Sequence, residues 1–298
     1  MSTHQPEVSF EFFPPKTVDM ENNLWDSICA LSPLAPSFLS VTYGAGGSTR
    51  ERTHNTVARI ISEAQLPVAA HLTCIDASRH EIDNIARRYW DIGVRHIVAL
   101  RGDLPNTTAN HGPSTEGYSY AADLVTGLRS VADFDISVAA YPEVHPEALN
   151  AASDLENLKR KIDSGASQAI TQFFFENDTF LRFRDRVVAA GIDVPLIPGI
   201  MPVSNFKSML RFAKLCGTRV PISMHNTFSK LDDSPYMQRQ VAIDLATQQC
   251  DELLAEGTNT FHFYTLNRSA LIRAVCENIG VKPNIIKLSS KEIHNDTL

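Results

Sequence analysis

The 298-residue sequence has little cysteine and no long apolar run. Its five cysteines are odd in number, widely spaced and outside any CxxC or Cys/His cluster, so they indicate neither a disulfide framework nor a structural zinc site. No uninterrupted apolar stretch is long enough to span a bilayer. The opening residues, MSTHQPE, are polar and do not have the pattern of a secretory signal. These absences predict a cytoplasmic protein with no metal and no membrane attachment.

The sequence also lacks an excess of basic residues. Its formal net charge is −7 at pH 7, whereas proteins that bind a phosphate backbone usually present a basic face. We therefore expect no nucleic-acid partner. A hydrophobic fraction of 43% with 20% charged residues is typical of a folded globular chain, so we expect a large core rather than disorder.

The main positive feature is a regular alternation of strand-like and helix-like segments. Segments 79–92, 154–163 and 179–190 have apolar residues at helical spacing, and glycines follow them at 93, 165 and 191. Most steps from strand to strand are about thirty residues, the length of one βα unit. The α/β pattern predicts a (βα)8 TIM-type barrel. The predicted strands are 8–12, 38–43, 68–73, 96–100, 136–141, 169–175, 195–200 and 260–265.

The spacing before the last strand is longer than the others. Residues 217–258 contain the Pro/Asp/Ser-rich stretch HNTFSKLDDSP and a helical pattern. No low-complexity linker or charge block divides the chain. We therefore expect one catalytic domain over 1–298, with an insertion of about 217–258 before the eighth strand.

The stretch GAGGST at 44–49 is similar to a dinucleotide-binding fingerprint but does not satisfy it. Thr49 stands where the third glycine belongs, and the motif follows the second predicted strand rather than the first. We interpret it as a loop at the mouth of the barrel, whose backbone amides could approach a cofactor closely.

Barrel active sites lie at the carboxyl ends of the strands, so polar residues there are the candidates. In SFEFFPPK (9–16), Glu11 sits among phenylalanines and two prolines follow it. This carboxylate is either half of a buried ion pair or a catalytic acid. In RGD (101–103), Arg101 and Asp103 follow an apolar strand, where they could form a surface ion pair or belong to the catalytic rim.

Further candidates follow other strands. His71 in VAAHLT is as consistent with a core histidine as with a ligand. On the predicted helix 154–163, Asn157, Arg160 and Lys161 could bind a phosphate or form a solvated helix face. Gln172 lies beside three aromatics, and its amide could bind a heterocycle. Other polar candidates are Tyr141, Glu143, His145, Glu147, Asn267 and Arg268, the last of which could hold a substrate carboxylate.

Long strings of the sequence resemble bacterial methylenetetrahydrofolate reductases. They run in order from about residue 8 to about 280 and include SFEFFPPK, SVTYGAGGSTRERTH, RHIVALRGDLP, ISVAAYPEVHPE and FHFYTLNR. The resemblance implies an FAD-containing barrel that NADH or NADPH reduces. The reduced flavin then converts 5,10-methylenetetrahydrofolate to 5-methyltetrahydrofolate in a ping-pong cycle, which supplies methionine biosynthesis. It also implies a cytoplasmic homo-oligomer. The alternatives are another FAD-barrel oxidoreductase of the proline dehydrogenase type, or a folate- or flavin-binding protein without turnover.

The resemblance also implies roles for individual residues. Glu11 is the expected general acid at N10 of the folate, and Asp103 is the expected carboxylate beside the flavin and the pterin. The implied substrate-binding residues are Glu11, Asp103, Gln172, Phe212 and Arg268. The implied FAD-binding residues are Thr42, Tyr43, Ala45, His71, Arg101, Gly102, Asp103, Tyr120, Ala121, Tyr141, His145, Asp154, Asn157, Arg160 and Lys161.

Some positions depart from the family pattern. Ser208 stands where the family can carry a folate-contacting glutamine, and the loop at 104–118 is long. A general acid must keep its proton at neutral pH. We expect the phenylalanines that flank Glu11 to remove water from its carboxyl group and so favour the protonated form.

Overall fold

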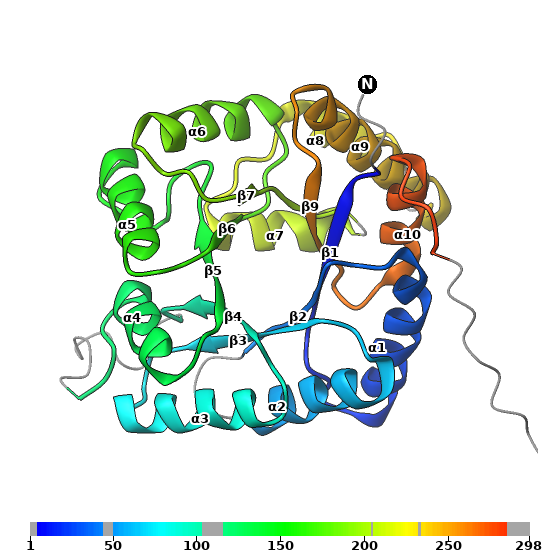
Figure 1. Ribbon diagram of the computed structural model, residues 1–298. Helices are drawn as coiled ribbons and strands as arrows, with labels where there is room; N and C mark the ends of the chain where they lie inside the picture. The colour runs from blue at the N-terminus through cyan, green and yellow to red at the C-terminus, as the bar shows by residue number, and fades with distance from the viewer. Residues whose placement is uncertain (1–4, 44–49, 103–115, 204, 232–233, 285–298) are drawn as a thin grey trace, which may run out of the picture.

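A computed structural model of the chain describes residues 5–43, 50–102, 116–203, 205–231 and 234–284. These residues form a barrel of parallel strands surrounded by helices (Figure 1). The strands are β1 (Glu7–Phe12), β2 (Leu39–Val41), β3 (Val68–Thr73), β4 (His96–Leu100), β5 (Asp135–Ala140), β6 (Gln168–Thr171), β7 (Leu196–Ile197), β8 (Gly199–Ile200) and β9 (Thr260–Tyr264). The helices are α1 (Val18–Leu31), α2 (Arg50–Arg59), α3 (Arg79–Asp91), α4 (Ala121–Val131), α5 (Ala151–Asp163), α6 (Asn177–Ala189), α7 (Phe206–Cys216), α8 (Ile222–Ser229), α9 (Pro235–Ala255) and α10 (Ser269–Asn278), with short turns η1 (Ser32–Leu34) and η2 (Ile60–Ala64).

The sheet closes through an interrupted strand. Its order is β7-β6-β5-β4-β3-β2-β1-β9-β8, and every pairing is parallel. β7 pairs with β6 and β8 with β9, while Pro198 between them lacks an N–H and uses its carbonyl to accept from His262 N at 3.0 Å. Segment 195–200 thus occupies the place of the predicted seventh strand, and the α/β barrel prediction is confirmed.

Two strands end well before the positions predicted from the sequence, and several others differ by one residue at an end. The predicted strand 38–43 ends at Val41, and the predicted strand 169–175 ends at Thr171. Beyond Thr171 the aromatic residues of this run pack in two separate apolar clusters. Phe173 packs with Met201 and Met209, whereas Phe174 stacks on Phe180 in the main core. The run is therefore a packing segment rather than the end of a strand.

The helices begin and end where local chemistry predicts. Ser78 and Glu81 form a capping box at the start of α3. Gly93, Gly165 and Gly191, which follow α3, α5 and α6, have φ angles of 98°, 111° and 72°, a region that glycine reaches without steric cost.

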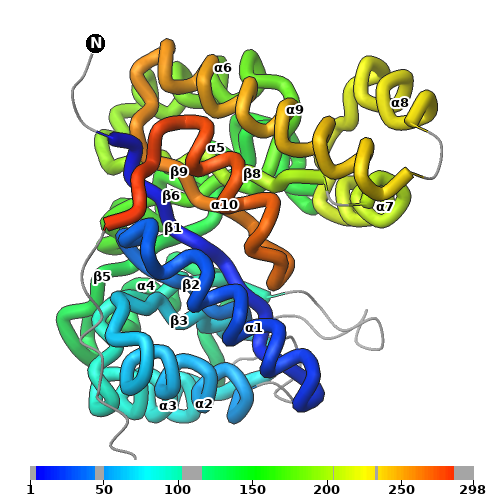
Figure 2. The backbone as a smooth tube through the Cα atoms, turned by 90° about the vertical axis from the view of Figure 1, so that its right-hand side faces the viewer, coloured from blue at the N-terminus to red at the C-terminus, as the bar shows by residue number. Residues whose placement is uncertain are grey.

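Residues 217–258 contain α8 and α9, which with α7 lie to one side of the barrel (Figure 2). A second apolar cluster, centred on Phe173, Met209, Met224 and Phe228, is distinct from the main core. It packs these helices against the end of the sheet. The boundaries of a single domain stay a prediction.

Candidate active site

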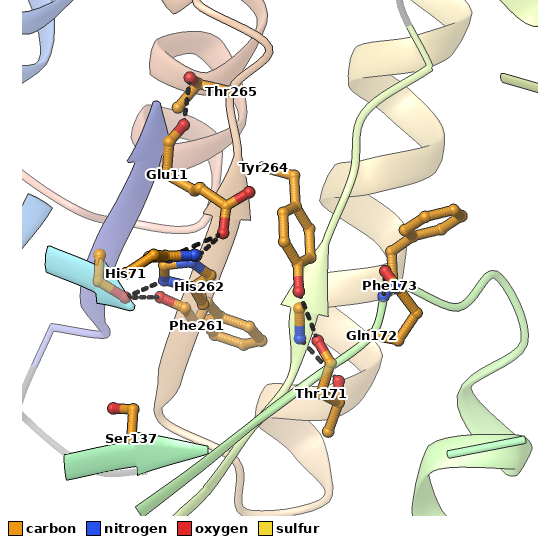
Figure 3. A network of polar contacts seen from close by, with 12 residues as sticks. Glu11, His71, Ser137, Thr171, Gln172, Phe173, Phe261, His262, Tyr264 and Thr265 are labelled. Atoms are coloured by element: carbon orange, nitrogen blue, oxygen red, sulfur yellow. Dashed lines mark hydrogen bonds and ion pairs between the residues drawn. The ribbon is translucent and has the colours of Figure 1, made fainter. Parts of the chain in front are cut away.

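Glu11 lies near the carboxyl end of β1, and its side chain points into the barrel (Figure 3). Its Oε2 atom is 3.5 Å from His71 Nε2 of β3 and 3.7 Å from His262 Nε2 of β9. The side chains of Glu11, His71 and His262 are 12%, 8% and 1% exposed. One carboxylate and two imidazoles therefore lie together inside the barrel, with little exposure to solvent.

The residues around this carboxylate are not the ones expected from the sequence. Side chains alternate along a strand, so Phe10 and Phe12 point away from Glu11 and are fully buried in the main core. The expectation that they desolvate the carboxyl group is wrong, because sequence neighbours in a strand face opposite sides. The strands β3 and β9 supply its surroundings instead.

His71 is a neutral neighbour of Glu11 at pH 7. Burial lowers the pKa of His71 to about 4, and the opposing effect of the Glu11 charge does not restore it. Among the described residues, Glu11 forms no ion pair with a Lys or Arg. A buried ion pair with a permanent cation is therefore not what holds this carboxylate.

A large cleft with a volume of about 1000 Å³ begins at Phe13, two residues after Glu11, and Glu11 itself does not line it. It lies between the β1–α1 loop, α1, the start of α9 and the β9–α10 loop. Arg268, the N-cap residue of α10, is exposed along this cleft. Asn267 joins its two sides, since it accepts from Phe13 N at 2.9 Å and donates to Phe13 O at 3.0 Å. The polar lining residues are Lys16, Asn23, Asp26, Ser27, Thr42, Arg239, Asn267, Arg268 and Ser269.

A second cavity of about 220 Å³ lies at the carboxyl ends of β3, β4 and β5. Lys161 Nζ donates to Ala139 O at 2.5 Å, and burial lowers the Lys161 pKa to about 8 against the opposing charge of Asp154. Arg101 pairs with Glu147 at 2.6 Å. Seven residues expected at the cofactor line this cavity: Tyr43, Arg101, Gly102, Ala121, Tyr141, His145 and Lys161.

This second cavity fits part of a dinucleotide cofactor. Two cationic side chains, Lys161 and Arg101, suit a pyrophosphate, and Tyr43 Oη is buried with no hydrogen-bond partner in the part of the chain that the structure describes. Gly102 has φ of 92°, and a Cβ there would lie 2.7 Å from Ile75 Cγ2, so only glycine leaves the backbone accessible.

The other expected cofactor residues that the structure describes do not line this cavity. Tyr120 is exposed at the N-terminus of α4, and Arg160 donates to Asn157 on the exposed face of α5. Asp154 accepts from His145 N at 2.9 Å, so it supports the cavity wall. Thr42 lines the large cleft and His71 contacts Glu11. Ala45 and Asp103 lie outside the described residues.

The expected substrate residues Gln172 and Phe212 both contact Phe173. Gln172 Oε1 accepts from Phe173 N at 3.0 Å, and the Phe212 ring stacks on Phe173. Ser208 is exposed in the first turn of α7, where its Oγ accepts from Arg211 at 3.2 Å. The roles of Gln172, Phe212 and Ser208 in binding a folate stay predictions.

The sequence analysis missed Ser9, His262 and Tyr264. Ser9 pairs in register with His262, and Glu11 pairs with Tyr264. The signal was present as two alternating strings, SFEF and FHFY, in which every second residue is aromatic and outward. Reading both strings with period two would have placed their polar residues together.

Two absences concern the described residues alone. No group of three His, Cys, Asp or Glu side chains in this part of the chain could hold a metal ion. In the same ranges, no helix is both long and apolar enough to cross a membrane.

Comparison with known proteins gives a family match over most of the chain. A family model described as methylenetetrahydrofolate reductase matches residues 1–280. The chain is 54% identical over 281 residues to 5,10-methylenetetrahydrofolate reductase of Escherichia coli (strain K12), covering 94% of this chain and 93% of that protein. It is 54% identical over 280 residues to the protein of the same name from Pectobacterium carotovorum subsp. carotovorum, covering 94% and 92%.

A solved structure shares the fold. It is an uncharacterized protein from Clostridium thermocellum that binds two copies of 5-methyl-5,6,7,8-tetrahydrofolic acid. The TM-score is 0.61 at 14% sequence identity, over 92% of this chain and 94% of the other. At this identity the likeness supports the barrel architecture.

Proposed function

The chain belongs to the methylenetetrahydrofolate reductase family, and we propose that it reduces 5,10-methylenetetrahydrofolate to 5-methyltetrahydrofolate through bound FAD, with NADH or NADPH as electron donor. The reductase activity is that of its relatives at 54% identity over nearly the whole chain. The cofactor, the donor and the ping-pong order are the finer parts of the proposal. A cytoplasmic homo-oligomer is proposed with them on the family resemblance.

The observation that carries the proposal is the position of Glu11. It is a nearly buried carboxyl group near the carboxyl end of β1, two residues before Phe13, which lines the large cleft. Within the described ranges, Glu11 forms no ion pair with a Lys or Arg. Opening the imidazolidine ring of the substrate requires a proton at N10. A carboxylic acid held within reach of that nitrogen acts as the general acid and yields the 5-iminium cation.

Bound FAD would supply the redox chemistry, which is hydride transfer from the nicotinamide donor to the methylene carbon. The chain supplies the binding and the proton. Lys161 and Arg101 would hold the pyrophosphate, and Gly102 would let the backbone approach the cofactor. Asp103 would keep a negative charge near the isoalloxazine, which disfavours an anionic reduced flavin and stabilises the cationic iminium.

The substrate side is proposed from three residues. Gln172 offers a donor and an acceptor to the pterin, and Arg268 offers a guanidinium to a carboxylate. Phe212 presents one ring face for stacking. Because a nicotinamide and a pterin are both flat, the same surface can serve each in turn, which gives ping-pong kinetics.

The test separates the two half-reactions. The purified protein should be yellow, bleached by NADH or NADPH without air, and recoloured by methylenetetrahydrofolate. Glu11→Gln should keep the bleaching and slow the recolouring by about 10²–10⁴-fold, the usual contribution of a general acid. Glu7→Gln, an exposed carboxylate at the start of the same strand, is the matched control and should change neither.

Each outcome decides between the candidates. If methylenetetrahydrofolate recoloured Glu11→Gln as fast as it recolours the unmodified protein, Glu11 would not be the general acid. Bleaching by proline or another imino acid, with no recolouring by the folate, would favour the proline dehydrogenase type. A yellow protein that neither reductant bleaches would favour a non-catalytic flavin-binding protein.

A further inference from the structure

We propose that Thr218 and Glu143 are positioning residues that hold the Phe212 ring where a flat ligand can stack on it. The inference rests on the proposed stacking role of Phe212. Thr218 follows α7, the helix that carries Phe212, and Glu143 lies in the β5–α5 loop. Both residues hold the carboxyl end of α7 through hydrogen bonds to other parts of the barrel.

Thr218 attaches the end of α7 to Phe173. Its Oγ1 donates to the carbonyl oxygen of Phe173 at 3.0 Å, and its N–H donates to Ala213 O at 2.9 Å. Thr218 is 7% exposed and Phe173 is 1% exposed, so water competes little for the bond. Gly217, with φ of 73°, ends the helix and turns the chain at this point. The residue whose ring lies under Phe212 therefore also supplies the acceptor that holds the end of α7.

Glu143 holds the next residue of the same segment. The N–H of Arg219 donates to both carboxylate oxygens of Glu143, at 3.0 Å to Oε1 and 2.9 Å to Oε2. A hydrogen bond that a carboxylate accepts is about twice as strong as one between neutral groups. The Arg219 guanidinium pairs separately with Glu176 at 2.9 Å, but its side chain is 72% exposed and such pairs contribute little. The carboxylate of Glu143 is therefore the stronger of these two attachments.

These hydrogen bonds supply the direction that apolar packing of α7 lacks. Met209 and Ala213 are buried in the second apolar cluster, and contacts of this kind are non-directional. At the amino end of α7, Asn205 Oδ1 accepts from Ser208 N at 2.8 Å, a bond that stays within the segment. A rotation or shift of α7 would move the Phe212 ring relative to Phe173. The bonds at the carboxyl end oppose that movement.

The loop that contains Glu143 also lines the second cavity. Tyr141 and His145 lie on either side of Glu143 in the sequence, line that cavity, and meet edge to face with ring centroids 4.6 Å apart. Pro146 of the same loop lies against Gly217, where an added Cβ would be 3.0 Å from Pro146 Cγ. One loop thus contacts both the proposed cofactor site and the end of α7. Loss of Glu143 should affect both sites, and loss of the Thr218 hydroxyl only the second.

The first test measures steady-state kinetics with methylenetetrahydrofolate in the flavin-loaded enzyme. Thr218→Val keeps the shape of the side chain and removes its hydroxyl. It should raise the KM for the folate about fivefold and change kcat by less than about twofold, because a lost positioning bond weakens binding. Thr218→Ser restores the hydroxyl and should return the KM to within about twofold of the unmodified value. Thr126→Val is the matched control, since Thr126 Oγ1 donates to Ala122 O at 3.2 Å on α4, and it should change neither constant.

A double-mutant cycle separates positioning from general destabilisation. If Thr218 acts through Phe212, Thr218→Val should lower kcat/KM about fivefold in the unmodified chain and less than about twofold in Phe212→Ala. A merely structural defect would lower kcat/KM equally in both backgrounds, and that result would overturn the proposal.

Glu143→Ala tests the link to the second cavity. It should raise the KM for the folate about as much as Thr218→Val does, and it should raise the Kd of FAD about threefold to tenfold. Thr218→Val should leave the Kd of FAD within about twofold. Glu143→Gln keeps an acceptor for Arg219 N and should restore part of both losses. Glu176→Gln is the matched control, because it removes only the exposed pair with Arg219 and should change neither constant.

The proposal and the stacking role fail in different ways. If Phe212→Ala lowers kcat/KM while Thr218→Val and Glu143→Ala leave the folate KM unchanged, the positioning proposal is wrong and the stacking role stands. If Phe212→Ala leaves kcat/KM unchanged, the stacking role fails and the positioning proposal fails with it. If the unmodified protein does not reduce methylenetetrahydrofolate, the proposed function is wrong before any variant is compared. If Glu143→Ala does not fold, the cycle with Thr218→Val decides alone.

Discussion

Phe212 of α7 stacks on Phe173 with ring centroids 5.6 Å apart and planes inclined by only 10°. Phe173 is 1% exposed, whereas Phe212 is 40% exposed. One face of the Phe212 ring is therefore held by a buried partner and the other is open. Such a ring is fixed in orientation before a flat ligand arrives, which reduces the entropy lost on stacking.

Phe212→Ala should weaken substrate use without damaging the fold. We expect kcat/KM to fall about tenfold for the folate and for the nicotinamide donor, which corresponds to about 1.4 kcal/mol of lost stacking. Phe173→Ala should instead reduce the free energy of unfolding by about 3–5 kcal/mol, since it opens a cavity in the second apolar cluster. Steady-state kinetics and chemical denaturation of both variants measure the contrast. A Phe212→Ala enzyme with unchanged kcat/KM for both substrates would contradict the proposed stacking role.

Lys161→Met should stabilise the flavin-free protein and weaken FAD binding. Burial lowers the Lys161 pKa to about 8, below its usual 10.5. The unfolded chain therefore holds this proton up to a higher pH than the folded chain does. The free energy of unfolding rises as pH increases from about 8 to 10.5, and it is lowest where the lysine is charged. At pH 7 the substitution should add about 1–3 kcal/mol to the free energy of unfolding, after allowance for partial exposure. The dissociation constant of FAD should rise about tenfold to a hundredfold, because a charge-assisted contact to phosphate is lost.

The control for this substitution lies on the same helix. Lys159→Met removes a lysine that pairs with Asp163 at 3.5 Å on the surface of α5. It should change neither the melting temperature of the flavin-free protein nor FAD titration. Equal effects of the two variants would argue against a phosphate site at Lys161.

Local sequence signals predicted the barrel but not the surroundings of its polar residues. The strands 68–73 and 96–100 have the bounds that their apolar runs indicate, because length and flanking turns are local properties. Glu11 was placed at a strand end in the same way. Its neighbours could not be read locally, since His71 and His262 come from strands that only closure of the barrel brings to β1.

The sequence was also less informative where one pattern serves two packing arrangements. TQFFF has the composition of a buried strand, yet its aromatics divide between two clusters after Thr171. Likewise, Asn157, Arg160 and Lys161 are close together on α5, but Lys161 alone turns toward the second cavity. Tertiary contacts, which one sequence does not display, decide both cases.

The buried His71 and the partly buried His96 should make the fold sensitive to mild acid. Burial lowers the pKa of His71 and of His96 to about 4, while an unfolded histidine titrates near 6.5. Between these values the unfolded chain binds protons that the folded chain does not, so stability falls as pH decreases from about 6.5 toward 4. His96→Gln should reduce the loss of unfolding free energy between pH 7.5 and 5 by about 1–2 kcal/mol. Urea denaturation at both pH values measures it, and an identical loss in the variant would contradict the assignment.

Gly199→Ala should open the barrel at its closure. A Cβ at Gly199 would lie 2.2 Å from the carbonyl oxygen of Thr171 and 2.6 Å from Tyr264 Cε2. The same Thr171 accepts from Tyr264 Oη at 2.8 Å through its carbonyl, and through its Oγ1 from Gly199 N at 2.9 Å. The methyl group would have to break these bonds or separate β8 from β6, so we expect a loss of about 3 kcal/mol or more of unfolding free energy.

Gly191→Ala gives the comparison that isolates this steric effect. Gly191 has φ of 72° and open space around the added methyl, so its replacement should cost only about 1–2 kcal/mol for the left-handed backbone. Melting temperatures of the two variants against the unmodified chain measure the difference. If Gly199→Ala melted no lower than Gly191→Ala, the contact between Gly199 and Thr171 would not be what closes the barrel.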